Sequence, residues 1–305
     1  MVDPLKLIEK RGAEILRMWV SNVDYSNDVQ AGQESFDRCT ESYRRVRNTC
    51  RYILGNLSDF DPAKDAVPYE KLLELDKWAL ASLANFLETC HQSYEKFEFH
   101  SIYQALQNYC TVDLSAIYLD ILKDRLYTFK KSGLERRAAQ TTIYNIVCTM
   151  VGVMAPVLSF LAEEVYQCLP GQREESVFLT DFPKVNAQWK NEDLYSKWAK
   201  LFEVRSSVTK KLEESRQNKL IGSGLEARVI LGVPQEFRSL LNEKLNDLPS
   251  VFIVSQVELK EADSLSINVE KALGEKCERC WNYSPETGAN KKFPAVCPKC
   301  VGALS

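Results

Sequence analysis

Apolar residues recur every three or four positions through most of the first 216 residues of the chain. The clearest stripe runs from Phe36 to Leu57. This spacing puts the apolar side chains on one face of an amphipathic helix. The helices that it predicts cover residues 5–20, 36–57, 72–90, 143–154 and 192–216. Long helices with short connections form antiparallel bundles, so a bundle is expected here, with a kink or a restart at Pro156.

The pattern changes after Asn218. Residues 227–233 and 251–259 are rich in β-branched side chains and are predicted to form strands. A short helix is predicted over 237–245, and 265–269 is a candidate third strand, which gives a small α+β module. Residues 1–216 show neither alternating strand–helix units nor a glycine-rich phosphate loop, so no parallel nucleotide-binding sheet is expected there.

Four cysteines near the C-terminal end have the spacing of a metal site. Cys277, Cys280, Cys297 and Cys300 form the pattern C-x2-C-x16-C-x2-C. Two such knuckles facing each other offer a tetrahedron of sulfur, which suits one structural Zn2+ ion. The alternative is two disulfides, which would need an oxidising compartment. No signal peptide supports that alternative, because residues 1–10 already carry several charges.

These signals predict a mainly α protein: an antiparallel helical bundle, then a small α+β module, then a C-terminal four-cysteine zinc knuckle. The expected limits are a connector helix over 1–30, the bundle over 31–217, the junction module over 218–274 and the zinc-binding module over 275–305.

Composition narrows the possible partners. The chain has 305 residues and a net charge of only -3, so a nucleic-acid partner would have to be held by local basic patches. The other six cysteines are scattered within apolar stripes, which is typical of reduced core thiols and favours the cytoplasm. No long apolar span points to a membrane. His91 and His100 are interpreted as solvated or capping residues rather than catalytic ones.

Three local patches could contact RNA. Arg44, Arg47 and Arg51 form a row beside the apolar stripe, which suits either RNA phosphates or a solvated basic face. Lys123 and Arg125 open a second basic segment, which runs to Arg137. Its aromatic residues, Tyr127 and Phe129, could stack on bases, but a place in the core is favoured for both.

The third patch is the first zinc knuckle. Arg279 lies inside it and Trp281 directly follows it. A knuckle is too small to bury an indole within itself. Trp281 therefore either presents a flat face to an RNA base or docks the knuckle onto the bundle.

Several stretches resemble the C-terminal part of a bacterial-type isoleucyl-tRNA synthetase. The resemblance spans essentially the whole chain in the right order. Its first part, Val2–Trp19, is similar to the segment that follows the family's Lys-Met-Ser-Lys-Ser loop. The stretches are Val2–Trp19, Tyr43–Tyr52 with Phe60–Pro62, Asp113–Asp120 with Lys123–Tyr127, and Ile221–Ala227 with Cys277–Asn282.

The resemblance implies a function and also a limit. The family joins isoleucine to its tRNA with ATP, but the ATP-binding motifs and the editing domain are missing here. The chain alone is therefore expected to lack catalytic activity. By resemblance, Arg279 and Trp281 contact the anticodon, and Arg44, Arg47 and Arg51 follow phosphates. The implied partners are an isoleucine-accepting tRNA and the catalytic portion of the same enzyme, with the chain a monomer.

Two other interpretations stay open. The chain could be a free-standing, non-catalytic tRNA-binding protein, which sequence alone does not separate from a fragment of a longer enzyme. It could also be an adaptor whose zinc module docks another polypeptide without any RNA. The adaptor would show no salt-dependent binding to an anticodon arm.

Overall fold

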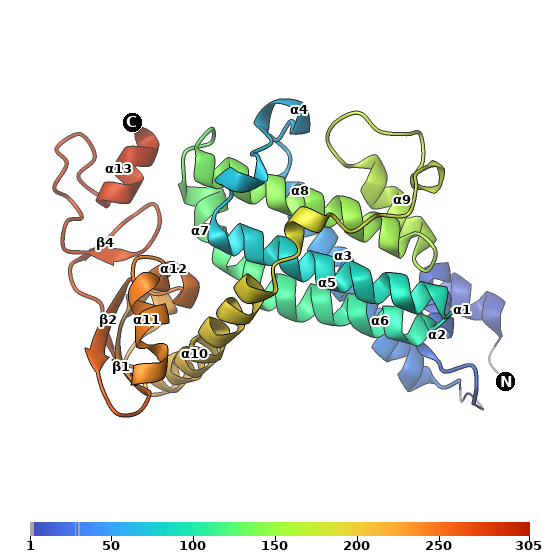
Figure 1. The fold of residues 1–305 in the computed structure, drawn as a ribbon, viewed down its shortest axis with the longest axis horizontal. Helices are drawn as coiled ribbons and strands as arrows, with labels where there is room; N and C mark the ends of the chain where they lie inside the picture. The colour runs from blue at the N-terminus through green and yellow to red at the C-terminus, as the bar shows by residue number, and fades with distance from the viewer. Residues whose placement is uncertain (1–2, 28, 30) are drawn as a thin grey trace. The chain divides into compact units, whose positions relative to one another are not determined.

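The computed structural model describes residues 3–27, 29 and 31–305, and it divides into two compact units. The first unit holds the chain up to Asp120 together with Arg137–Asn191, and the second holds Ile121–Arg136 and Glu192–Ser305. The fold is mainly α, with a small sheet in the C-terminal part of the chain (Figure 1). It ends in a cluster of four cysteines, so the predicted class is confirmed.

The first unit is helical. Two elements connect it with the second unit along the chain, since α7 (Leu119–Thr128) leads out of it and α8 (Leu134–Met154) leads back. Its other elements are α1 (Pro4–Arg11), α2 (Ala13–Asn22), α3 (Gln33–Asn56), α4 (Pro62–Asp65), η1 (Tyr69–Lys71), α5 (Glu74–Glu95), α6 (Phe99–Asn108), η2 (Tyr109–Tyr118), α9 (Ser159–Gln167), η3 (Val177–Leu179) and η4 (Ala187–Trp189).

The apolar stripes form the core of this unit, as predicted. On α3 the buried residues include Phe36, Val46 and Ile53, and on α5 they include Leu83 and Cys90. The helix α5 packs against α6, and α2 packs against both α3 and α6. Burial of these stripes supplies the main driving force for folding the unit.

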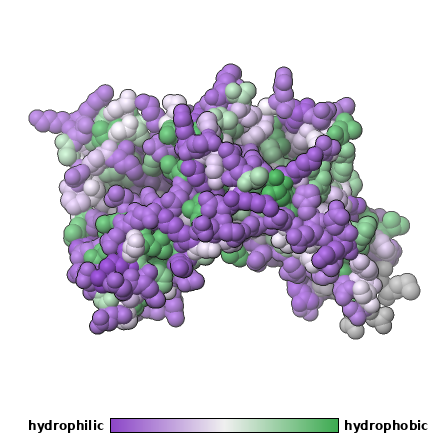
Figure 2. All heavy atoms as spheres, in the orientation of Figure 1, coloured by the Kyte–Doolittle hydropathy of each residue, from purple (hydrophilic) through white to green (hydrophobic). Residues whose placement is uncertain are grey.

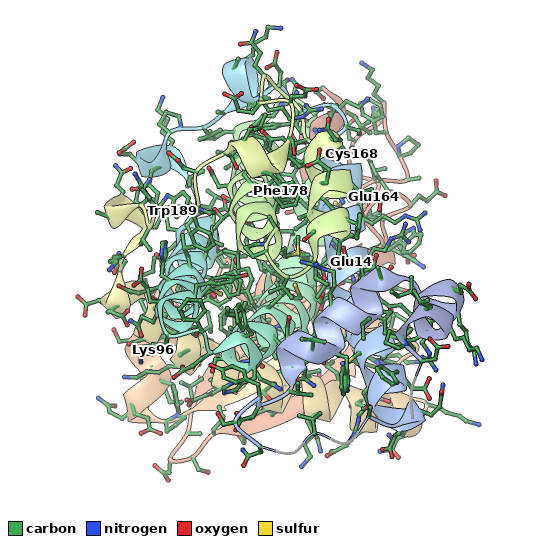
Figure 3. All side chains as sticks on the ribbon, turned by 90° about the vertical axis from the view of Figure 1, so that its right-hand side faces the viewer. Glu14, Lys96, Glu164, Cys168, Phe178 and Trp189 are labelled. Carbon is green, nitrogen blue, oxygen red and sulfur yellow. The ribbon has the colours of Figure 1, made fainter. Side chains whose placement is uncertain are left out.

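Buried polar contacts fix the helices within the unit. Glu14 of α2 accepts hydrogen bonds from the backbone N–H groups of Phe160 (2.6 Å) and Leu161 (3.0 Å), so it caps the start of α9 (Figure 3). The segment η2 is π-helical, and its Asp113 accepts a hydrogen bond of 2.8 Å from Ser82 on α5. Burial raises the pKa of Asp113, and the Ser82 hydrogen bond opposes that rise.

The second unit contains a long helix, a small sheet and the cysteine module. Strand β1 (Ala227–Val233) is central, parallel to β2 (Gln256–Glu261) and antiparallel to β3 (Ser266–Lys271). The helices α11 (Gln235–Glu243) and α12 (Leu248–Phe252) lie on the crossover from β1 to β2. The elements are α10 (Glu192–Gln217), η5 (Gly224–Glu226), β1 (Ala227–Val233), α11 (Gln235–Glu243), α12 (Leu248–Phe252), β2 (Gln256–Glu261), β3 (Ser266–Lys271), β4 (Glu275–Lys276), β5 (Tyr283–Ser284) and α13 (Pro298–Leu304).

The compact units do not follow the predicted domain limits, which stay predictions. The helix α10, expected in the bundle, belongs to the second unit. Its Arg205 donates a hydrogen bond of 2.8 Å to the carbonyl of Val251, and Lys197 pairs with Glu243 of α11 at 2.6 Å.

Two predicted elements were wrong in part. The helix expected over 5–20 is broken at Gly12, whose φ of 87° no helix accommodates, and Leu5 is 72% exposed rather than packed. The strand expected over 251–259 begins only at Gln256. Residues 248–252 form the short helix α12 instead, with Pro249 in its first turn, and its buried residues Val251 and Phe252 gave the apolar signal.

The restart expected at Pro156 is confirmed, because α8 ends at Met154 and α9 begins at Ser159. Along the described residues, no helix combines the length with the apolar character that a bilayer crossing requires. The face drawn in Figure 2 is mainly hydrophilic, with apolar side chains in small scattered groups.

Candidate metal centre and RNA-contact residues

The first cysteine knuckle is built by a two-stranded hairpin. Strands β4 and β5 pair through Lys276 and Tyr283, and the knuckle occupies the turn between them. Cys277 donates its backbone N–H to the carbonyl of Asn282 (2.8 Å), and Trp281 donates its own to the carbonyl of Cys277 (2.9 Å). Trp281 closes the turn with a left-handed φ of 64°.

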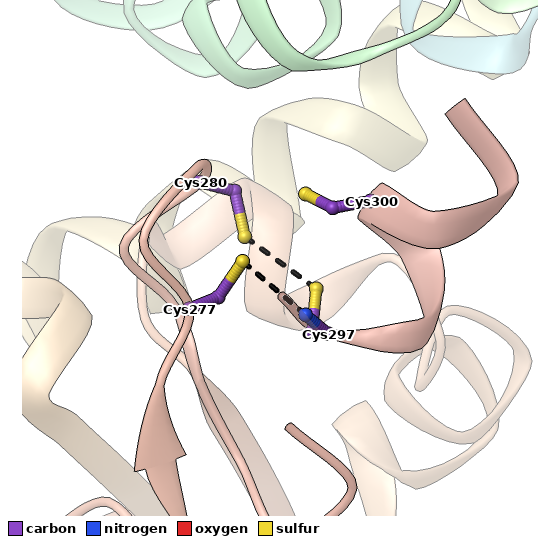
Figure 4. A group of neighbouring side chains, drawn as sticks. All are labelled: Cys277, Cys280, Cys297 and Cys300. Carbon is purple, nitrogen blue, oxygen red and sulfur yellow. Dashed lines mark hydrogen bonds between the residues drawn. The ribbon is translucent and has the colours of Figure 1, made fainter. Parts of the chain in front are cut away.

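The second knuckle is the start of a helix. Cys297 is the N-cap of α13, Pro298 is its first residue, and Cys300 lies in its first turn. Cys297 also donates its backbone N–H to the sulfur of Cys277 at 3.3 Å, which joins the two knuckles (Figure 4).

The four sulfur atoms lie within 4.8 Å of one another, and those of Cys280 and Cys297 are 3.6 Å apart. A disulfide bond would need an S–S distance of about 2.05 Å. All ten cysteines are free thiols, which argues against the disulfide alternative. Zn–S bonds of about 2.3 Å give a tetrahedron with edges of roughly 3.8 Å, so the spacing fits one Zn2+ ion.

The electrostatics also favour a cation. Burial alone would raise the pKa of Cys277, but the backbone N–H groups of Cys280, Cys297 and Arg279 lower it to about 6. The pKa values of Cys297 and Cys300 are raised by burial and by the neighbouring sulfur of Cys280. A divalent cation relieves the repulsion between thiolates, and with four sulfur ligands no position is left for water or substrate. The zinc is therefore structural.

The structure places the two predicted anticodon residues differently. The side chain of Trp281 is 61% exposed, and the amino group of Lys276 lies 5.6 Å from the centre of its ring. Arg279 is half-buried and donates a hydrogen bond to the carbonyl of Thr128, the last residue of α7. The residue that docks the knuckle is thus Arg279, whereas Trp281 points outward.

The predicted arginine row lies on an exposed face of α3. Arg44, Arg47 and Arg51 are all exposed. Arg47 is 3.5 Å from Glu164 of α9, a residue seen in Figure 3. Within the described part of the chain, Arg44 and Arg51 have no ion-pair partner, so both guanidinium groups can reach an external anion.

The second basic segment divides into exposed and buried residues. Lys123 is exposed. Arg125 is only 6% exposed, and its guanidinium donates to the carbonyl of Glu135 at 2.6 and 3.2 Å, so it braces the turn between α7 and α8. Tyr127 is 59% exposed, which corrects its assignment to the core, and Phe129 is half-buried.

Sequence reasoning also missed the contact that Lys299 makes. Lys299, between Cys297 and Cys300, pairs with Asp124 of α7 at 2.7 Å. Burial lowers the pKa of Lys299, but the Asp124 carboxylate outweighs it and raises the pKa above the ordinary value. In the sequence both residues counted only as charges in separate basic segments, and no local signal joins positions 175 residues apart.

Comparisons with known proteins agree with this site. Residues 76–231 match the family model of the anticodon-binding domain of tRNA ligase, and residues 274–301 match that of a zinc finger found in FPG and IleRS. The chain belongs to the family of anticodon-binding domains of tRNA ligases.

Among curated relatives, the chain is similar to isoleucine–tRNA ligases. It is 46% identical over 315 residues to that of Geobacter sulfurreducens, 45% over 313 residues to that of Carboxydothermus hydrogenoformans and 47% over 316 residues to that of Syntrophotalea carbinolica. Each alignment covers 100% of this chain and 34% of the relative, so the chain spans about a third of their length. The resemblance to isoleucyl-tRNA synthetases is confirmed.

The chain also matches a solved complex of a leucyl-tRNA synthetase from Agrobacterium radiobacter K84. That match covers 62% of this chain and 22% of the synthetase chain. The TM-score of 0.48 and the identity of 14% are too low to bear on the fold.

Proposed function

We propose that this chain holds the anticodon arm of an isoleucine-accepting tRNA, as the anticodon-binding part of an isoleucine–tRNA ligase. The observation that carries the proposal is the exposed indole of Trp281, held outward on the four-cysteine knuckle. An exposed indole costs free energy unless a partner covers it, and unpaired bases stack on such rings. The family membership of residues 76–231 supports RNA as that partner.

The helical unit would supply the second part of the grip. Arg44 and Arg51 are exposed on one helix without ion-pair partners among the described residues. Lys123 adds a third exposed cation, on α7. Guanidinium groups bind phosphates through paired hydrogen bonds, whereas the stacked indole would contact the bases.

The joining of isoleucine to tRNA would then be performed by the catalytic portion of the same enzyme. In this scheme the chain positions the tRNA as a monomer and takes no part in the bond-making step itself. The ten free cysteines support a reducing, cytoplasmic location.

The test is binding of a cognate anticodon stem-loop to the zinc-loaded chain. Trp281→Ala should weaken that binding by about 5- to 150-fold, the loss of one base–aromatic stack, and should weaken a scrambled loop less. Trp281→Phe should restore most of the affinity. The matched control is Phe178→Ala, which removes a ring that is 57% exposed on η3. Equal losses for cognate and scrambled loops would make Trp281 a packing residue.

The phosphate contacts have a separate readout. Arg44→Gln and Arg51→Gln should each lower the slope of log affinity against log salt by roughly 0.7 to 0.9, with similar loss for every loop sequence. Lys96→Gln, which removes a cation from the exposed C-terminal end of α5, should leave the slope unchanged. Unchanged slopes for both arginine variants would place the row outside the RNA-binding surface.

A further inference from the structure

Two cations of the zinc module converge on the C-terminal end of α7, within the same compact unit. Lys299 donates to both carboxylate oxygens of Asp124, at 2.7 and 2.8 Å. Arg279 donates to the carbonyl of Thr128. Thr128 in turn donates its hydroxyl to Asp124 at 2.8 Å, so these four residues form one connected network.

Each knuckle provides one of the cations. Arg279 lies between Cys277 and Cys280, and Lys299 lies between Cys297 and Cys300. The C-terminal end of a helix carries partial negative charge, which favours cations there. The amino group of Lys299 also lies 5.5 Å from the centre of the Phe129 ring, just beyond α7. Two attachment points, one from each knuckle, restrict rotation of the module on α7.

A separate set of contacts holds the base of the module. The hydroxyl of Ser255 accepts a hydrogen bond of 2.7 Å from the backbone N–H of Tyr283. Gln256 exchanges two hydrogen bonds with the backbone of Leu273, at 2.8 and 2.9 Å. Because these contacts do not involve α7, the module would stay folded and tethered if its contacts with α7 were lost.

We propose that Asp124 and Thr128 are positioning residues, which dock the zinc module through Lys299 and Arg279 and so orient Trp281 outward. This gives Arg279 a docking role in place of the anticodon contact that the resemblance implies. The consequence for RNA rests on the proposed function, whereas the docking can be measured without RNA. In this arrangement α7 sets the direction in which the metal-bound knuckle presents its indole.

The test is a double-mutant cycle in the zinc-loaded chain with Asp124→Asn, Lys299→Gln and the double variant. The measurements are zinc content, hydrogen exchange and affinity for the anticodon stem-loop. Each single variant should keep one zinc, exchange about three- to tenfold faster over residues 125–131 and 277–301, and bind RNA about three- to tenfold more weakly. The double variant should be no weaker than either single variant.

The sign of the Asp124→Asn effect separates positioning from direct contact. Removing a carboxylate makes the surface more positive, so a purely electrostatic role for Lys299 predicts tighter RNA binding. Docking predicts weaker binding. The control is Glu88→Gln, which breaks an exposed ion pair with Lys190 of the same 2.7 Å length. This variant should change neither exchange in the zinc module nor affinity.

Three results would overturn the proposal: unchanged exchange in both single variants, tighter RNA binding by Asp124→Asn, or additive losses in the double variant. A different pattern would reject the proposed function alone. In that pattern exchange accelerates as expected, while Trp281→Ala and both docking variants bind RNA as the unaltered chain does.

Discussion

The helical unit and the zinc module hold their structures in different ways. In the helical unit, apolar side chains such as Leu83, Leu87 and Ile143 are fully buried. Among the described residues, the buried cluster of the zinc module consists of the four cysteines, and Val296 is the partly buried apolar side chain that packs against it. The helical unit has a hydrocarbon core, whereas the zinc module has a core that a metal must complete.

Size explains this difference. A segment of about 30 residues buries too little apolar surface to offset the entropy of ordering its chain. Metal binding supplies the missing free energy, which for structural zinc sites is about 10–16 kcal/mol. The module can therefore carry an exposed aromatic residue and many charges, because its stability does not depend on burying them. The helical unit instead needs its apolar stripes intact.

The largest expected effect is the loss of a zinc ligand. Cys277→Ser or Cys300→Ser should abolish tight zinc binding and unfold the module. The three remaining thiolates leave one coordination position of the zinc open and hold the ion only weakly. Hydrogen exchange over residues 275–304 should approach that of an unfolded chain, while α5 keeps its protection. Cys168→Ser, at an exposed thiol of the helical unit, is the control and should change neither. If these variants are free of zinc and the amides of the zinc module still resist exchange, the claim that the module needs its metal to fold is contradicted.

A cavity-forming substitution in the hydrocarbon core should have the opposite effect: it should destabilise the helical unit and leave the zinc site intact. Leu83→Ala removes a fully buried side chain of α5 and should lower the free energy of unfolding of the helical unit by about 2–5 kcal/mol. Zinc content should stay at one per chain. Leu5→Ala, at a position 72% exposed, should cost much less. Denaturant unfolding followed by circular dichroism checks the stability, and loss of zinc from Leu83→Ala under native conditions would show that the two regions depend on each other.

A substitution at a glycine with positive φ tests the segment that leads into the zinc module. Gly274 has a φ of 88°, and a Cβ there would lie 2.2 Å from the carbonyl carbon of Ser284. Gly274→Ala should therefore destabilise the module by about 1–3 kcal/mol and weaken zinc binding. Gly302→Ala is the matched control, because a Cβ on α13 meets open space and alanine favours a helix. Competition with a chelator measures both, and equal effects would remove the steric argument.

The smallest expected effect depends on pH. The folded-state pKa of Asp113 is raised by burial, so the folded state binds its proton more readily than the unfolded state. Stability should accordingly rise as pH falls through the folded pKa, with the gain complete below the unfolded value. Asp113→Asn should remove this dependence and be neutral or slightly stabilising at pH 7. Unfolding curves between pH 4 and pH 7 test this, and identical pH profiles for the two proteins would contradict it.

The features that were predicted correctly from the sequence are those that depend on residues close together along the chain. The stripe on α3 and the four metal ligands were found because their signals repeat within a few positions. The break at Gly12 and the helical turn at Pro249 were missed, because the surrounding apolar pattern continued across both. Local spacing therefore gave the types of structure more reliably than their limits.

Contacts between distant positions were outside the reach of that reasoning. Arg279 and Thr128 are 151 residues apart, and nothing near either residue marks the other. The same holds for the burial of Arg125, whose charge suggested an RNA contact while its guanidinium satisfies the carbonyl of Glu135. Charge alone does not distinguish a cation that braces a turn from one that faces solvent.

The most direct measurement of the central claim is the affinity of the anticodon stem-loop before and after zinc is removed by a chelator. The account predicts that the stripped chain keeps its helical circular dichroism signal and binds the loop at least about tenfold more weakly, with affinity restored by added Zn2+. An unchanged affinity in a chain shown to be free of zinc would contradict the claim that the metal-bound module contacts RNA.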